Sequence, residues 1–568
     1  MFRCFVKDRK YNMWNYEPHD ETLDSPLNYK MFDGDVFFKN ELNEIIVQQS
    51  PVKKCINIPG ILLLENNRTY GRTENKKRLY YKCKPNDPSL PYFLIPYEIP
   101  MGFNKNFKNK YITFHYQHWN EKHPHGIISQ NLGDVYDLPA FNEYQLYCKG
   151  LHSSISQAIT KTKKKVSEND MEYYQNEIVM NPKRFGEISF SHNQDDIFVF
   201  SIDPRGCTDR DDALSIITSY SGEIVEHLVT VYIANVWMWL DVFDLWDTLG
   251  ERVSTIYFPD MKRPMLPTML GEQLCSLDQG QHRFAMCMDF TIMEHPRKGV
   301  YIQYLDSTRP TISQCSITVK RNFAYEEPLL LENEDYKQLL KVTQKLDKNI
   351  NNSHELVAYW MMQMNFYTGK HMKYEKFGLF RTVQSKKETY FETDELPTFV
   401  RIWEQQMSGS YVPIENKIQN LSHDVLGYSQ YVHFTSPIRR LADLLNQIAW
   451  VKNHMKVENM SKGALKFYNM HMANIDILND KMKKIRRIQA DAHILHTVTH
   501  DPEILDKTYD AIVLTLAGEK STVYIDELKW LTHGKVSDDA NIYDLVQCKL
   551  FVFENEEKMS KKIRIQVV

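Results

Sequence analysis

The stretch SIDPRGCTDRDDALSI, residues 201–216, places four carboxylates within ten residues: Asp203, Asp209, Asp211 and Asp212. Asp203 ends the apolar run IFVFSI, and Asp211 and Asp212 open the next apolar run. Pro204 and Gly206 lie between the two runs, so the chain has to turn there. We therefore expect the aspartates to meet at one edge of a sheet.

Carboxylates at this spacing repel one another, and some take up protons unless a cation compensates their charge. Hard oxygen ligands favour Mg²⁺ or Mn²⁺ over zinc, and such ions support phosphoryl transfer. An EF-hand is excluded, because the stretch has no glycine at loop position six and no glutamate at position twelve. The alternative is a solvated acidic turn without a ligand.

A second stretch, YVHFTSPIRRLADLL at residues 431–445, predicts the start of a helix. Residues 435–436 can cap the helix, and Pro437 suits its first turn. Arg439 and Arg440 would then lie in the first turn, where the helix dipole disfavours cations. We expect them to hold an anion, because guanidinium groups match phosphate oxygens. The alternative is that they pair with nearby acidic residues.

The chain of 568 residues reads as several domains. Short strand-like runs up to residue 150 predict one or two small β-barrels. Strands over 195–317 followed by helices over 335–500 predict an α+β domain, with one long helix over 468–498. Residues 505–568 return to strand-like runs. The charged segment 156–177 is interpreted as a solvated linker or helix, the alternative being an RNA-binding patch.

Composition limits the functional classes. The net charge is -4, so a nucleic-acid partner would have to bind local basic patches. The nine cysteines form no CxxC pairs and have no histidine companions, which argues against a zinc site and against a disulfide framework. The first residues do not resemble a signal peptide, and no long apolar run predicts a membrane span. We expect an intracellular, cytoplasmic protein.

The two motifs together resemble those of the RNB-domain, or ribonuclease II, family of 3′-to-5′ exoribonucleases. The first is similar to the family's IDP…DxDDA signature, and the second to YxHFTSPIRRYxDL, with Leu441 where tyrosine is usual. Between them, RVSTIYFPDMKRPMLPTMLGEQLCSLDQGQHRFA follows the family's TSVYLP…PMLP…LCSL…R pattern. The segments KPNDPSLPYFLIP and HWNEKHPHGIISQNLGD resemble a barrel of the eukaryotic exosome-type branch, whose additional N-terminal nuclease domain is not expected here.

The resemblance implies an α+β chain with two cold-shock-type OB barrels at residues 1–65 and 66–150. An α+β RNB catalytic domain would follow at 151–502, and a C-terminal OB barrel at 503–568. It implies Mg²⁺-dependent, processive hydrolysis of single-stranded RNA to nucleoside 5′-monophosphates, with Mn²⁺ as a possible substitute for Mg²⁺. The protein would act as a monomer or within an RNA-decay assembly.

The resemblance also assigns roles to residues. The implied metal ligands are Asp203, Asp209 and Asp212. The implied catalytic residues are Asp211, which positions an ion or the attacking water, and Arg439 and Arg440, which hold a phosphate. The implied RNA contacts are Tyr257, Gln489, Ser436 and Pro437.

One departure from the family lies before Glu355, between the segments LLKVTQKLDKN and SHELVAYW. Only a few residues separate two predicted helices there, whereas relatives carry a β-hairpin whose aromatic side chain grips the RNA end. Processivity and product length are therefore expected to differ. An alternative function is a catalytically weak or inactive RNB-fold RNA-binding regulator. Such relatives lose the aspartates, and this sequence keeps all four.

Overall fold

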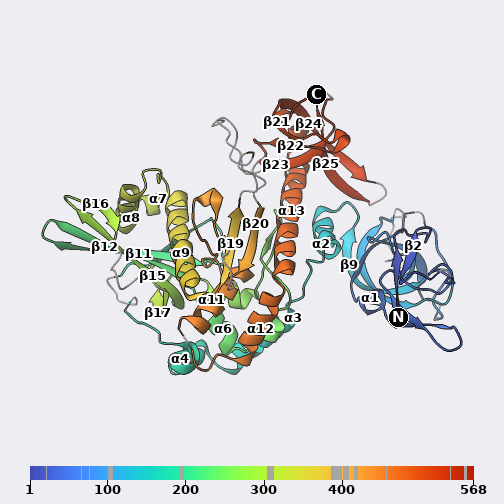
Figure 1. Cartoon of the computed structure of the whole chain (residues 1–568), viewed down its shortest axis with the longest axis horizontal. Coiled ribbons are helices and arrows are strands. Elements are labelled where there is room, and N and C mark those ends of the chain that lie inside the picture. The colour runs from blue at the N-terminus through green and yellow to red at the C-terminus, as the bar shows by residue number, and fades with distance from the viewer. Residues whose placement is uncertain are drawn as a thin grey trace. The chain divides into compact units, whose positions relative to one another are not determined.

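The protein is described by a computed structural model with the predicted α+β fold class (Figure 1). It divides into two compact units: the first holds residues 1–152, 258–261 and 486–568, and the second holds 153–257 and 262–485. The described residues are all except 21, 66, 76, 100–106, 192–196, 304–311, 385–399, 401–407, 415–419, 456, 538, 556–558 and 568. The predicted division into four domains stays a prediction.

Strands dominate the N-terminal part of the first unit. One sheet has the order β2-β1-β3-β4, and a closed barrel has the order β5-β6-β7-β9-β8. The elements are β1 (Phe2–Val6), β2 (Trp14–Glu17), β3 (Val36–Lys39), β4 (Ile45–Gln49), α1 (Pro51–Lys54), β5 (Ile58–Leu62), β6 (Leu79–Pro85), β7 (Phe93–Tyr97), β8 (Lys110–His118), β9 (His125–Asp134) and α2 (Leu138–Cys148).

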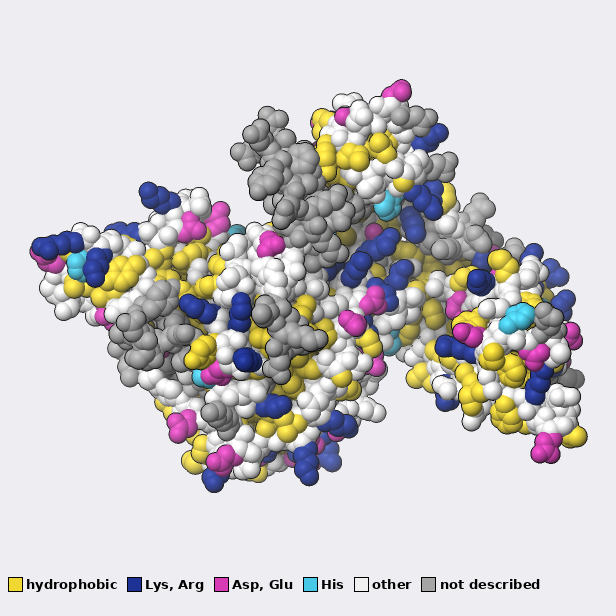
Figure 2. Space-filling view, in the orientation of Figure 1, with side chains coloured by type: hydrophobic (Ala, Val, Ile, Leu, Met, Phe, Trp, Pro, Cys, Tyr) yellow, Lys and Arg dark blue, Asp and Glu magenta, His cyan; other side chains and the backbone are white. Residues whose placement is uncertain are grey.

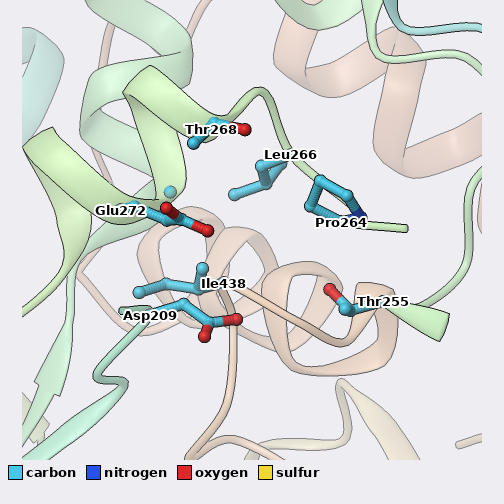
Figure 3. A pocket seen from close by; sticks show the side chains of 8 residues that line it. Asp209, Thr255, Pro264, Leu266, Thr268, Glu272 and Ile438 are labelled. Atoms are coloured by element: carbon cyan, nitrogen blue, oxygen red, sulfur yellow. The ribbon is translucent and has the colours of Figure 1, made fainter. Parts of the chain in front are cut away.

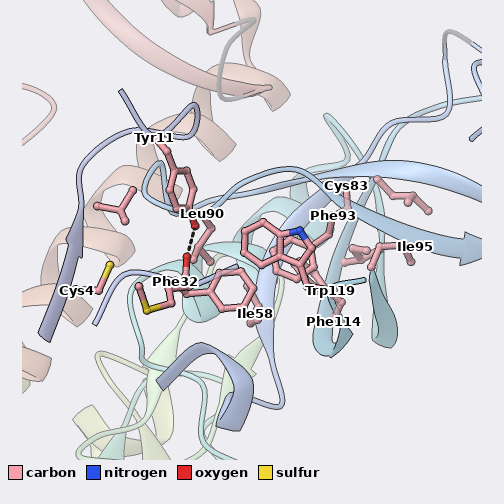
Figure 4. Close-up of a cluster of buried hydrophobic side chains, with 14 of the residues drawn as sticks. Cys4, Tyr11, Phe32, Ile58, Cys83, Leu90, Phe93, Ile95, Phe114 and Trp119 are labelled. Atoms are coloured by element: carbon pink, nitrogen blue, oxygen red, sulfur yellow. Dashed lines mark hydrogen bonds between the residues drawn. The ribbon is translucent and has the colours of Figure 1, made fainter. Parts of the chain in front are cut away.

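This sheet and the barrel share one hydrophobic core (Figure 4). Phe32, between β2 and β3, stacks on Phe93 of the barrel with ring centroids 5.8 Å apart. Trp119 also packs against the ring of Phe32. The hydroxyl of Tyr11 donates to the carbonyl of Met31 at 2.9 Å, so this polar group is satisfied inside the core. β5 precedes residue 65, the expected domain boundary, yet its partners are barrel strands.

A mixed sheet forms the centre of the second unit. Its order is β16-β15-β12-β11-β10-β18, with β17 also paired to β15; β10 and β18 run parallel. Its long apolar runs are buried, as expected for strands covered on both faces. The strands are β10 (Phe200–Asp203), β11 (Asp212–Ser221), β12 (Ile224–Ala234), β15 (His282–His295), β16 (Gly299–Ile302), β17 (Ile312–Thr318) and β18 (Arg321–Ala324).

Helices and short strand pairs complete the second unit. The charged segment at 156–177 forms helices, with Ala158 and Thr162 buried. The elements are α3 (Ser156–Glu168), α4 (Met171–Val179), α5 (Pro182–Phe185), α6 (Val236–Val242), β13 (Ile256–Tyr257), β14 (Lys262–Arg263), α7 (Pro328–Glu332), α8 (Glu334–Leu346), α9 (Ser353–Glu375), β19 (Leu379–Gln384), β20 (Ser408–Pro413), α11 (Leu441–Asn453), α12 (Lys462–Ala473) and α13 (Ile475–His500). The residues of α13 from 486 on belong to the first unit.

Two helix predictions need correction. The long helix over 468–498 is interrupted at Asn474, whose backbone leaves the helical region, so α12 and α13 are separate. The second motif starts its helix later than predicted: α11 begins at Leu441, and residues 436–440 form a turn. The backbone of Arg440 is held extended by a bridge to Ser254, and this tertiary pairing delays the helix.

Residues 347–352 join α8 to α9 without a strand, in agreement with the absence of the hairpin inferred from the sequence. The nine cysteines all lie in the described residues, and none of them forms a disulfide. In the described parts of the chain, every helix falls short of the length or hydrophobicity that crossing a membrane requires.

The C-terminal part of the first unit is a sheet with the order β23-β22-β21-β24-β25. Alternate side chains such as Val523 and Leu550 bury one face against the end of α13. The strands are β21 (Thr508–Thr515), β22 (Ser521–Ile525), β23 (Trp530–Gly534), β24 (Leu545–Asn555) and β25 (Ser560–Val567).

Candidate active site

The acidic stretch lies where two neighbouring strands of the central sheet meet. Asp203 ends β10 and Asp212 begins β11, and the antiparallel pairing of Phe200 with Leu214 brings these ends to the same edge. The turn between the strands carries the remaining aspartates, and Gly206 in it has φ +79°. That conformation suits glycine, because a side chain there is strained.

Asp211 is 2% exposed and accepts two hydrogen bonds. The backbone N–H of Ile438 donates to Oδ1 and Arg439 Nε donates to Oδ2, each at 2.9 Å. Burial raises the pKa of the Asp211 carboxyl to about 7, although the Arg439 charge opposes this. Burial disfavours the charged guanidinium, but the neighbouring groups, Asp211 foremost, together outweigh it and raise the pKa of Arg439. Asp211 thus fixes one orientation of Arg439.

Asp203 and Asp212 are buried carboxyls whose charge is balanced only in part. The Ser201 hydroxyl donates to Asp203 Oδ2 at 2.7 Å, and Arg210 Nε lies 3.6 Å from the same oxygen. Burial raises the pKa of Asp203. Burial and the charges of Asp203 and Asp211 raise the pKa of Asp212 well above its usual range. Among the described residues, no side-chain hydrogen bond or ion pair reaches the Asp212 carboxylate.

Asp209 is held by a lysine that the sequence analysis did not single out. Lys262 Nζ lies 3.2 Å from Asp209 Oδ1 and 2.5 Å from Glu272 Oε1. The hydroxyl of Tyr257 lies 3.5 Å from Asp209 Oδ2, and Tyr257 is 41% exposed. Asp209 and Glu272 both line a small pocket whose wall also contains Ile438 (Figure 3).

The turn at residues 436–440 is supported by Asp443, which is fully buried in α11. The backbone N–H of Ser436 and Arg440 Nη2 both donate to Asp443 Oδ1 at 2.8 Å. Arg439 Nη2 donates to Ser436 Oγ, also at 2.8 Å. Both arginines therefore pair with acids, which was the alternative to the anion-holding interpretation. Pro437 lies within this turn, between Ser436 and the arginines.

Two further residues are Tyr325, which adjoins Asp203, and Gln489, which was predicted to contact RNA. Tyr325 follows β18, its backbone N–H donates to the carbonyl of Asp203 at 3.1 Å, and its ring stacks on His354 with centroids 3.6 Å apart. The sequence analysis missed Tyr325, because a parallel strand pairing over a long sequence distance places it there. Gln489 lies half-buried on α13 in the first unit, and its role stays a prediction.

The donor set of the acidic edge fits a hard divalent cation. Its ligands are carboxylate oxygens, and Asp203 and Asp212 have raised pKa values that a cation would reverse. The site does not form a closed cage: among the described residues, no three of the aspartates bring oxygens within 4.8 Å of one another. Three of the four carboxylates instead have a basic partner: Asp203 pairs with Arg210, Asp209 with Lys262 and Asp211 with Arg439.

Comparison with known proteins supports this assignment of the central region. A family model described as the RNB domain matches residues 192–331 and 327–456. Ribonuclease R of Buchnera aphidicola is 25% identical over 371 residues, covering 52% of this chain and 49% of that protein. The mouse exosome complex exonuclease RRP44 is 29% identical over 175 residues, but covers only 29% of this chain and 16% of that protein. Likeness to the exosome branch is thus weaker than expected.

Two solved structures share the fold. RNase R of Mycoplasma genitalium, in complex with ribose-methylated single-stranded RNA, matches with a TM-score of 0.65 and 16% identity, covering 100% of both chains. Yeast Ssd1, described as a pseudonuclease, matches with a TM-score of 0.55 and 13% identity, covering 97% of this chain and 81% of that chain. The chain spans about half the length of the curated relatives it matches. On its sequence motifs and the matched family model, residues 192–456 of the chain form an RNB domain.

Proposed function

We propose that the chain is a Mg²⁺-dependent exoribonuclease that hydrolyses single-stranded RNA processively from the 3′ end to nucleoside 5′-monophosphates. One observation carries the proposal: Asp211 fixes Arg439 beside Asp203 and Asp212, two buried carboxyls whose charge nearby basic groups balance only in part. This arrangement pairs a fixed cationic group for a phosphate with oxygen ligands for a metal ion. The relatives named ribonuclease R support the same activity.

In the proposed mechanism, Asp203, Asp209 and Asp212 would hold Mg²⁺, for which Mn²⁺ can substitute. A bound ion of this kind supplies stabilisation of charge on phosphate oxygens and lowers the pKa of water. Asp209 has to exchange its contact with Lys262 for the cation, since its Oδ1 lies 3.2 Å from Lys262 Nζ. The lysine then remains available to Glu272.

The arginine turn would bind the scissile phosphate. Arg439 is held on two sides, by Asp211 and by Ser436, and its side chain is 43% exposed, so its guanidinium has a fixed position and solvent access. Arg440 is 21% exposed and is oriented by Asp443. Ser436 and Pro437 shape the turn that presents both groups.

RNA binding would rest on local patches and aromatic faces. Figure 2 shows lysine and arginine side chains in separate groups, interspersed with acidic ones, on the face it displays. Tyr257 offers an exposed ring next to Asp209, on which a base can stack. Gln489 is proposed to contact the 3′ nucleotide. The protein would work as a monomer or within an RNA-decay assembly.

A second candidate is an RNB-fold RNA-binding regulator with little or no activity. The contact between Lys262 and Asp209 favours it, because a lysine there occupies a carboxylate that the metal would need. The fold shared with the pseudonuclease Ssd1 is compatible with this role. Retention of all four aspartates favours the enzyme.

The deciding experiment uses a linear, 5′-labelled single-stranded RNA and a circular RNA of the same sequence. With Mg²⁺, we expect the linear RNA to shorten from its 3′ end with release of 5′-mononucleotides, and the circle to stay intact. EDTA should stop the reaction and Mn²⁺ should restore it. Binding of both RNAs without cleavage would establish the regulator instead. Equal cleavage of the circle would rule out end-first hydrolysis.

A further inference from the structure

Three potential metal ligands meet at the C-terminal ends of α9 and α11. His371 Nε2 lies 3.1 Å from Glu375 Oε1 and 3.0 Å from His454 Nδ1, and His454 Nδ1 lies 3.0 Å from Glu375 Oε1. Within the described parts of the chain, this is the group of three His, Cys, Asp or Glu side chains whose ligand atoms all lie within 4.8 Å. No role assigned above involves these residues.

Hydrogen bonds alone cannot satisfy this triangle of atoms while Glu375 is ionised. An ionised carboxylate only accepts, so its contacts with His371 and His454 each require a proton on the ring nitrogen. The contact between the two nitrogens requires only one proton, and two N–H groups facing each other repel. Every assignment of protons therefore leaves one of the three contacts unfavourable. A cation at the centre removes the conflict, because all three atoms then present lone pairs to it.

The triangle also has the dimensions of a coordination sphere. Its edges are nearly equal, at 3.0–3.1 Å. An ion about 2.1 Å from each atom, a usual metal–nitrogen distance, would see the ligands at angles of about 95°. Two imidazoles and one carboxylate on one face of an ion suit late first-row divalent metals, and leave further positions for water. The side chains of His371, Glu375 and His454 are 14%, 31% and 26% exposed, so an ion can enter from solvent.

The surrounding fold holds the ligands in place. His371 and Glu375 are four residues apart on α9 and so share one face of the helix. The buried ring of Trp450 packs against both imidazoles, with centroids 4.9 Å from His371 and 4.6 Å from His454. Both helices direct their C-terminal ends to the cluster, and the partial negative charge at a helix C-terminus favours a cation.

We propose that His371, Glu375 and His454 form a second metal site, which binds a late first-row divalent ion such as Zn²⁺ and clamps the end of α9 to the end of α11. It is separate from the acidic edge, because α11 rises about 20 Å from Leu441 to Asn453. Its imidazole ligands disfavour Mg²⁺, which prefers oxygen and retains its waters. The proposal does not depend on the exoribonuclease activity.

The clamp would act on the support of the arginine turn. Asn365 of α9 accepts the backbone N–H of Phe434 at 2.8 Å and donates to the hydroxyls of Tyr431 and Thr435. The loop that leads into the arginine turn is thus hydrogen-bonded to α9, while α11 begins directly after that turn. Tying the far ends of the two helices together would stabilise this pair.

The test measures Zn²⁺ binding by the full chain, freed of metal and supplied with excess Mg²⁺ to occupy the acidic edge. We expect one tightly bound Zn²⁺ per chain and a rise in Tm on its addition. Removing a hydrogen-bond partner of a metal ligand typically weakens metal binding roughly 10- to 100-fold. The double variant H371Q/H454Q removes two ligands themselves, so it should weaken Zn²⁺ binding by more than that. Co²⁺ serves as a visible-absorption probe, whose spectrum should change in Glu375→Gln.

The matched control is H496Q/H500Q. These histidines are also four residues apart on one helix, with rings stacked 3.9 Å apart, but among the described residues they belong to no such three-ligand group. This control should bind Zn²⁺ as the unmodified chain does. Equal affinity in H371Q/H454Q, or an equal loss in the control, would overturn the proposal. If the double variant fails to fold, an unchanged affinity and Co²⁺ spectrum in Glu375→Gln would overturn it.

Discussion

The two ends of α11 present two different kinds of cation chemistry. Its N-terminal end adjoins Arg439 and the aspartates, whose oxygens suit a hard ion and whose charge is partly balanced by basic side chains. Its C-terminal end adjoins two imidazoles and one carboxylate, whose short contacts hydrogen bonds cannot all satisfy. The difference teaches that donor type, and not the amount of negative charge, decides which ion each end suits.

The largest expected effect is at the acidic end. Asp211→Asn should lower the rate of RNA hydrolysis by about a thousandfold, because the amide places an N–H against Ile438 or Arg439 and removes a charge from the site. RNA affinity should change little, since binding rests on other surfaces. Single-turnover kinetics and a filter-binding titration measure the two quantities.

Asp247→Asn is the control for this substitution, because Asp247 forms an exposed surface pair with Lys466. It should leave both rate and affinity unchanged. If Asp211→Asn retained more than a few per cent of the unmodified rate, the proposed role of Asp211 would be wrong.

A second substitution asks whether the acidic end depends on its buried support. Asp443→Ala should destabilise the second unit by about 3 kcal/mol, because it leaves Arg440 without its buried partner and the Ser436 N–H without an acceptor. The midpoint of urea unfolding reports the change. Asp247→Ala should cost less than about 1 kcal/mol. Equal shifts in the two variants would contradict the buried-support interpretation.

His471, which is outside the proposed metal site, shows how burial alone affects the pH dependence of stability. Burial and the neighbouring Lys481 lower the pKa of His471 to about 4. In the unfolded chain His471 binds a proton below about pH 6.5. In the folded chain it binds that proton only below about pH 4. Stability should therefore fall as the pH drops through this window, by no more than about 3 kcal/mol for this group.

Thermal unfolding between pH 7 and 4 measures this dependence, with EDTA present to exclude metal effects. His471→Gln should flatten the curve, and His500→Gln, at an exposed position, should leave it unchanged. An unaltered slope in His471→Gln would show that other groups control acid sensitivity.

The smallest expected effect concerns the RNA end. Tyr257→Ala should weaken the hold on short RNAs by about 1 kcal/mol, the low end for base stacking, because the ring is 41% exposed. The products should become longer and more scattered without a loss of hydrolysis. A 5′-labelled product ladder measures this. An unchanged, sharp limit product would point to another aromatic, and Tyr325 stacked on His354 is then the next candidate.

Much of the acidic edge could be predicted because its residues are close in sequence. Asp203 and Asp212 flank one turn, so any antiparallel pairing of the two strands brings them together. The contact of Asp211 with Arg439 spans 228 residues and was not predicted, since the resemblance implied only that the two motifs serve one site. The start of α11 was predicted too early, because capping residues at 435–436 look like a helix start unless the bridge of Arg440 to Ser254 is known.

The sequence by itself determined the α+β class, the family and the acidic motif, since these depend on local hydrophobic patterns and on residues gathered in short stretches. Only the tertiary structure decided that Lys262 binds Asp209 and that Tyr325 lies beside Asp203. It alone also brought His454 to the His371–Glu375 pair, 83 residues from His371. The cysteine pattern had argued against a zinc site. The proposed ligand set leaves no compact motif in the sequence, because the packing of two helices, and not spacing along the chain, brings its residues together.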